Sequence, residues 1–174
     1  MKKLFCSRRN KPETLSAGCF FTDGRLYLAG YQPMKKKPCI SGIGGHMEEG
    51  ETELQTAIRE LIEELFEINP VPKSVQKDIE IYVAPQKIVR NLSYTIFQYS
   101  FNDLETILKL MKQYDLKSPL YNSFPLTVAD LVFHRLSPTN TLPEISHLVI
   151  LPFVKNKNLI CPFLLSDICK LQVE

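Results

Sequence analysis

The sequence has no CxxC cysteine pair and no apolar run long enough to cross a membrane, and we expect no secretory leader. Its five cysteines form neither a CxxC pair nor a zinc-like spacing, so we expect reduced thiols and a cytoplasmic location. At the N-terminus, Arg8 and Arg9 break a very short apolar run, and we expect no signal peptide there. Repeats and low-complexity linkers are also missing, so the sequence predicts a single domain over residues 1–174 with no membrane partner.

Basic residues are scarce in one window, residues 45–67, where Arg59 stands alone among many carboxylates. This window holds eight of the 19 acidic residues of the chain: Glu48, Glu49, Glu51, Glu53, Glu60, Glu63, Glu64 and Glu67. Outside it, 20 basic residues face 11 acidic ones, and residues 1–13 form a basic arm. A basic frame around an acidic patch suits an anionic ligand held through a divalent cation.

Hydrophobic periodicity predicts an α/β fold with strands and helices in mixed order. The expected strands are 15–22, 25–32, 79–89, 93–101 and 144–153, the first two joined by a hairpin turn at Asp23-Gly24. The expected helices are 52–67, 103–115 and 162–172. Residues 128–136 are compatible with a short helix or a strand.

The helix at 52–67 carries the strongest chemical signal. Thr52 and Gln55 match a capping box. At 100° per residue, Glu63 and Glu64 lie within about 60° and 40° of Glu60, so the three carboxylates project from one face. A solvated helix face normally alternates acidic and basic residues. Here no lysine or arginine lies one turn away, and the repulsion among the three carboxylates costs roughly 1 kcal/mol. We therefore favour a hard divalent cation with oxygen ligands over a solvated face.

The order of these residues resembles the Nudix box, G-x5-E-x7-R-E-U-x-E-E-x-G-U, where U is aliphatic. Gly45, Glu51 and the run from Arg59 to Glu64 match its spacing. The resemblance implies an α/β/α sandwich with a mixed central sheet flanked by helices, extending over residues 15–172. Phe66 and Glu67 depart from the pattern at the glycine and the last aliphatic position. Because that glycine ends the helix in the family, we predict that the helix here runs about a turn further, toward Asn69.

What the resemblance implies is a hydrolase that cleaves a diphosphate linked to another group with Mg²⁺ or Mn²⁺. By match to the box, the metal ligands are Glu60, Glu63, Glu64 and the Gly45 carbonyl. Arg59 and Glu51 are implied to pair and to orient the helix against the glycine-rich passage at residues 39–51, which we call the glycine loop. The general base is either a box glutamate or Glu144 from a later loop, although an exposed residue at a strand start explains Glu144 equally well.

Three functions are compatible with the sequence. The leading one is a pyrophosphohydrolase acting on a small nucleoside diphosphate derivative. The first alternative is RNA 5′-cap or 5′-triphosphate processing, suggested by basic residues such as Lys35, Lys36 and Lys37 but without an aromatic-rich RNA-binding signature. The second is a non-catalytic nucleotide-binding module, against which the intact box glutamates argue. Residues 102–143 are compatible with a lid, a specificity element or the contact of a homodimer.

Overall fold

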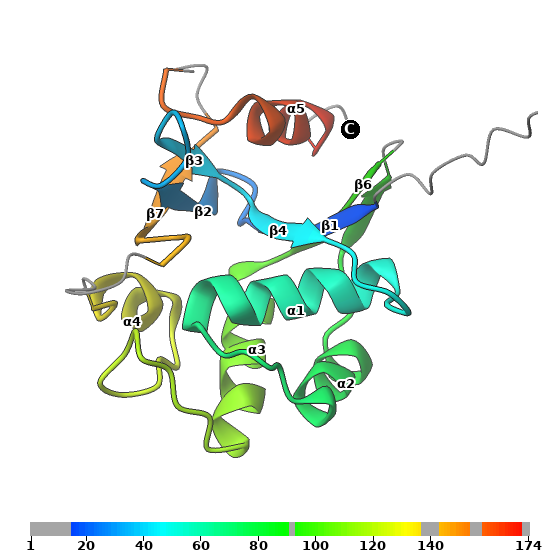
Figure 1. Ribbon diagram of the computed structural model, residues 1–174, viewed down its shortest axis with the longest axis vertical. Coiled ribbons are helices and arrows are strands. Elements are labelled where there is room, and N and C mark those ends of the chain that lie inside the picture. Colours follow the sequence, from blue (N-terminus) through cyan, green and yellow to red (C-terminus); the bar gives the residue numbers. More distant parts are fainter. Residues whose placement is uncertain (1–14, 91–92, 137–142, 154–157, 172–174) are drawn as a thin grey trace, which may run out of the picture.

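The computed structural model describes residues 15–90, 93–136, 143–153 and 158–171. The predicted arm at 1–13 and part of the segment at 102–143 lie outside these residues. The elements, in chain order (Figure 1), are β1 (Ser16–Phe21), β2 (Leu26–Gln32), β3 (Cys39–Ser41), β4 (Ile43–His46), α1 (Glu53–Phe66), α2 (Lys73–Tyr82), β5 (Lys87–Arg90), β6 (Tyr94–Tyr99), α3 (Phe101–Gln113), α4 (Val128–Phe133), β7 (His147–Pro152) and α5 (Pro162–Leu171). None of the helices in the described part is long and apolar enough to cross a membrane.

The strands form two small sheets, and the β1–β2 hairpin contributes one strand to each. One sheet has the order β4-β1-β6-β5, with β1 and β6 parallel and the other pairs antiparallel. The other has the antiparallel order β3-β2-β7. At the turn, the Asp23 carboxylate accepts hydrogen bonds from the backbone N–H groups of Arg25 and Leu26. The predicted α/β class with a mixed sheet flanked by helices is confirmed.

Strand alternation divides the apolar residues between two cores. On β2, Leu28 belongs to the core under α1 to α4, whereas Tyr27 and Ala29 belong to the core under α5. Because successive strand side chains point to opposite faces, the sheets separate these cores. Figure 1 shows α5 on one side of the strands and α1 to α4 on the other. The sheets therefore lie between helical layers, and α1 packs against β1 and β4.

Helix α1 ends earlier than predicted. Its last helical residue is Phe66, and Glu67 adopts a left-handed conformation with φ 51°. The predicted extension toward Asn69 is therefore wrong. Phe66 is fully buried and stacks on Phe124 at 5.0 Å between ring centroids, with Tyr121 at 5.8 Å. The aromatic side chain thus anchors the last turn in the core, and the chain reverses one residue later.

Residues 79–89 were also expected to be a strand, and for most of that range this expectation is wrong. The segment begins inside α2, continues through a loop and only then enters β5. Val75, Ile79 and Val83 are buried at spacings of four residues, whereas Ile81 is 60% exposed. The alternation of Ile79 and Ile81 suggested a strand, but burial follows the helical period because α2 packs against α1 and α3.

The described part of the segment at 102–143 contributes to the core. Helix α3 buries Leu104, Ile107, Leu108 and Met111, and α4 buries Leu131. Residues 128–136, compatible with a helix or a strand by sequence, form α4 at their start. Thr127 caps it with a capping box that includes Asp130.

We predict that Glu67→Gly raises the free energy of unfolding by about 1 kcal/mol, because glycine adopts a positive φ without the steric cost that other residues incur. Urea denaturation measures the change. The control, Glu80→Gly inside α2, should lower the same quantity by about 1 kcal/mol. Destabilisation by both variants would contradict the prediction.

Candidate functional site

A glycine-rich strand runs directly over the carboxylates of α1. The backbone N–H of Gly44 donates to Oε2 of Glu64 over 2.8 Å. A Cβ atom at Gly45 would lie 2.4 Å from the Glu60 carboxyl carbon, so only glycine leaves room for that carboxylate. At Gly44, with φ +151°, a Cβ would lie 2.5 Å from the Ala17 carbonyl oxygen on β1. The packing of β4 on β1 thus requires Gly44, whereas Gly45 leaves space for the Glu60 carboxylate.

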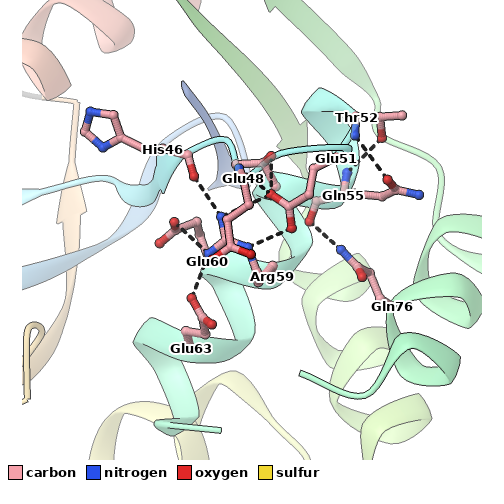
Figure 2. Close-up of polar contacts among 10 residues, drawn as sticks. His46, Glu48, Glu51, Thr52, Gln55, Arg59, Glu60, Glu63 and Gln76 are labelled. Atoms are coloured by element: carbon pink, nitrogen blue, oxygen red, sulfur yellow. Dashed lines mark hydrogen bonds and ion pairs between the residues drawn. The ribbon is translucent and has the colours of Figure 1, made fainter. Parts of the chain in front are cut away.

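Arg59 joins the glycine loop to the acidic face of α1 (Figure 2). Its Nε donates to Glu51 over 2.8 Å, and its Nη2 donates to the His46 carbonyl over 2.7 Å. Its Nη1 donates to Glu60 over 2.9 Å and to Glu63 over 2.8 Å. We call these five residues the Arg59 network. The pair that the resemblance implied, Arg59 with Glu51, is present within this larger network.

The network shifts the pKa values of Glu51 and Arg59. Although burial acts in the opposite direction, the hydrogen bond from Arg59 lowers the pKa of Glu51. Burial also opposes the charge of Arg59, but Glu51 and Glu60 outweigh it and raise the pKa of the guanidinium. The one basic residue of the acidic window therefore stays charged and contacts three carboxylates. Neighbouring Glu48 joins them through its backbone N–H, which donates to Glu51 over 3.0 Å.

Glu64 lies on the inner side of the acidic face, away from Arg59. Only 6% of it is exposed. Burial raises the pKa of Glu64 well above its usual value, and Glu144 and Glu60 raise it further against the opposing hydrogen bond from Gly44. Burial likewise raises the pKa of Glu60, with Arg59 opposing it and Glu63 and Glu144 adding to it. Glu60, Glu64 and Glu144 therefore form one electrostatically coupled group.

Glu144 reaches this group from the segment before β7. Its Oε1 accepts a hydrogen bond from Nε2 of Gln32, at the end of β2, over 3.0 Å. The same Nε2 lies 3.5 Å from Oε1 of Glu64. Lys35 approaches Glu144 at 3.6 Å, with about half of each side chain exposed. Sequence reasoning missed Gln32, because nothing in the strand pattern indicates that its side chain turns toward α1.

Arg135 binds the backbone at Glu64 and next to Glu144. Its Nη2 donates to the Glu64 carbonyl over 3.0 Å and to the Ile145 carbonyl over 2.7 Å. Its Nη1 donates to the Leu65 carbonyl over 2.6 Å. The guanidinium thereby satisfies carbonyls in the last turn of α1, which have no partners within the helix. It also ties that turn to the residue after Glu144.

The acidic residues at the two ends of the window lie away from Glu60, Glu63 and Glu64. Glu53, at its start, accepts hydrogen bonds from Thr95 over 2.6 Å and from Arg90 over 3.2 Å, so it belongs to the β5–β6 side. Glu67 lies beyond the helix end. In the described residues, no three His, Cys, Asp or Glu side chains stand in a ready-made metal-binding arrangement. The Arg59 guanidinium contacts the carboxylates of both Glu60 and Glu63.

Structural comparison finds similarity to Nudix hydrolases. A bifunctional NMN adenylyltransferase/ADP-ribose pyrophosphatase from Francisella tularensis, complexed with AMP and a Mn ion, is 16% identical with a TM-score of 0.45. The alignment covers 92% of this chain but only 38% of that protein. A Nudix-family hydrolase from Clostridium perfringens is 16% identical with a TM-score of 0.41, over 92% of this chain and 96% of that one.

A Nudix hydrolase from Nitrosomonas europaea is 20% identical with a TM-score of 0.32, over 50% of this chain and 56% of that one. No protein-family model and no curated protein matches the chain. The structures from Clostridium perfringens and Nitrosomonas europaea are named as Nudix hydrolases.

We predict that Arg135→Met lowers the free energy of unfolding by about 3 kcal/mol, because several buried carbonyls lose a charged donor. Chemical denaturation followed by circular dichroism measures the loss. Arg135→Lys keeps the charge but not the planar fork, so its loss should be intermediate. A change below about 1 kcal/mol in Arg135→Met would contradict a structural role for these hydrogen bonds.

Proposed function

We propose that this protein is a divalent-metal-dependent pyrophosphohydrolase of the Nudix type, cleaving a nucleoside diphosphate linked to another group. The observation that carries the proposal is the convergence of Glu60, Glu64 and Glu144 around the Gly44–Gly45 strand. Besides burial, the charge of Glu144 raises the pKa of both Glu60 and Glu64, and Arg59 contacts only Glu60 among the three. The negative charge of these three carboxylates is only partly compensated by the protein, so a bound cation would stabilise the group.

The residues fit Mg²⁺ or Mn²⁺. All the side-chain donors are carboxylate oxygens, which hard cations prefer. The space beside Gly45 admits the Glu60 carboxylate, because a Cβ there would overlap it. In this proposal Glu60, Glu63, Glu64 and the Gly45 carbonyl hold the metal. When bound, the metal offsets the charge of the phosphate oxygens and favours attack by water.

The remaining residues orient these groups and handle the proton. Arg59, bonded to Glu51 and the His46 carbonyl, holds α1 at a set distance from the glycine loop. Glu144 is the proposed base: its side chain is 59% exposed and lies beside buried Glu64, so it can accept a proton from water at the edge of the group. Lys35, next to Glu144, adds a positive charge at the same edge.

The decisive experiment is a hydrolysis panel with Mg²⁺ or Mn²⁺ over nucleoside diphosphate sugars, dinucleoside polyphosphates, nucleotides and capped RNA. Wild type should release a nucleoside monophosphate from at least one small substrate. Glu64→Gln should lower that rate by roughly 10²–10³-fold, because a ligand and its charge are lost. Cleavage of capped RNA alone would replace this proposal with cap processing. Equal inertness of wild type and Glu63→Gln/Glu64→Gln would favour a binding module.

The base assignment has its own test. Glu144→Gln should lower the turnover number by about 10²-fold or more while the substrate KM changes little, since general-base catalysis typically contributes that factor. Near-normal turnover would remove Glu144 as the base and leave a box glutamate in that role.

Gly45→Ala should lower metal-activated turnover roughly tenfold or more without unfolding the chain, because the new methyl displaces the flexible end of Glu60. Gly42→Ala is the matched control. Among the described residues, a Cβ there meets only Leu164, at an ordinary 3.6 Å. Turnover and thermal unfolding of the two variants are compared side by side. Equal turnover would show that the space beside Gly45 does not matter to the site.

A further inference from the structure

Gln32 is a buried neutral side chain placed between two carboxylates. It is 5% exposed and comes from β2, whereas Glu64 comes from α1 and Glu144 from the segment before β7. Its Nε2 lies 3.0 Å from Glu144, a good hydrogen bond, and 3.5 Å from Glu64, at the outer limit of one. The amide therefore holds Glu144 more strongly than Glu64.

Glu144 needs such a partner. Its carboxylate is repelled by Glu60 and Glu64, and its side chain is 59% exposed, so solvent competes for it. The ion pair with Lys35 is also solvent-exposed, and surface pairs of this kind contribute little. The amide of Gln32 donates from a buried position, where a hydrogen bond to a carboxylate is stronger.

The neutrality of this side chain also matters. A lysine or arginine at the same place would hold the carboxylates but would cancel the negative charge that attracts a cation. An amide has two N–H donors on one nitrogen and no net charge. It can keep two carboxylates close while leaving their charge available.

We propose that Gln32 is a positioning residue that holds Glu144 beside Glu64, so that the carboxylate of Glu144 acts on the same metal-binding group as the box glutamates. This inference rests on the proposed function and adds to it a residue outside the box. Gln32 acts through Glu144, so removing Gln32 should have no effect once Glu144 has been neutralised.

A double-mutant cycle tests this with Mn²⁺ alone, measured as free Mn²⁺ by electron paramagnetic resonance on the full chain. Gln32→Met keeps the length of the side chain and removes the amide. It should raise the Mn²⁺ dissociation constant about tenfold, in the range seen when residues that orient metal ligands are lost. Glu144→Gln should raise it similarly, and the double variant should bind no more weakly than Glu144→Gln. Fully additive effects, or unchanged binding in Gln32→Met, would overturn the inference.

Gln76→Met is the matched control. The Gln76 amide donates to the Gln55 carbonyl over 2.6 Å on the α2 side of α1, so its loss should affect thermal stability but not Mn²⁺ binding. If Gln32→Met fails to fold, Gln32→Asn replaces it, since the shorter amide stays polar but cannot reach Glu144. Wild type that neither binds Mn²⁺ nor hydrolyses any substrate would refute the proposed function. Binding and hydrolysis with an additive cycle would refute the positioning role alone.

Discussion

The Arg59 guanidinium is the group on which the site depends. It is 9% exposed and contacts three carboxylates and one backbone carbonyl. Removing one partner of a buried ion pair costs about 3–5 kcal/mol, because the other charge stays buried without compensation. Here the partners belong to both α1 and the glycine loop, so the position of the helix and the spacing of its carboxylates rest on the same contacts.

A second set of contacts links α1 to the sheet formed by β3, β2 and β7. Arg135 joins the carbonyls of Glu64 and Ile145, and Gln32 joins the side chains of Glu64 and Glu144. One connection works through the backbone and the other through side chains. Together they bring Glu144 to the carboxylates of α1 across a long stretch of chain. Because these partners come from separate elements, the packing of the sheets on α1 decides whether the group forms.

The departure of Phe66 from the glutamate box has a packing explanation. The Phe66 ring stacks on Phe124, and the next residue, Glu67, adopts the left-handed conformation. The segment that supplies Phe124 and Tyr121 also supplies Arg135, which binds the carbonyls of the same turn. The residues after α3 thus support the end of α1.

By itself the sequence determined the local elements with strong periodic signals: the β1–β2 hairpin, α1 with its cap at Thr52, and the carboxylates that share one face of that helix. The pairing of Arg59 with Glu51 was implied by the resemblance to the Nudix box, and both residues lie within one loop and the helix that follows it. The sequence failed for α2, where an alternating run is helical because burial follows Val75 and Ile79. Only the tertiary structure decided that Gln32, Arg135 and Glu144 meet at Glu64, since contacts between separate elements depend on how sheets and helices pack, which no local pattern records.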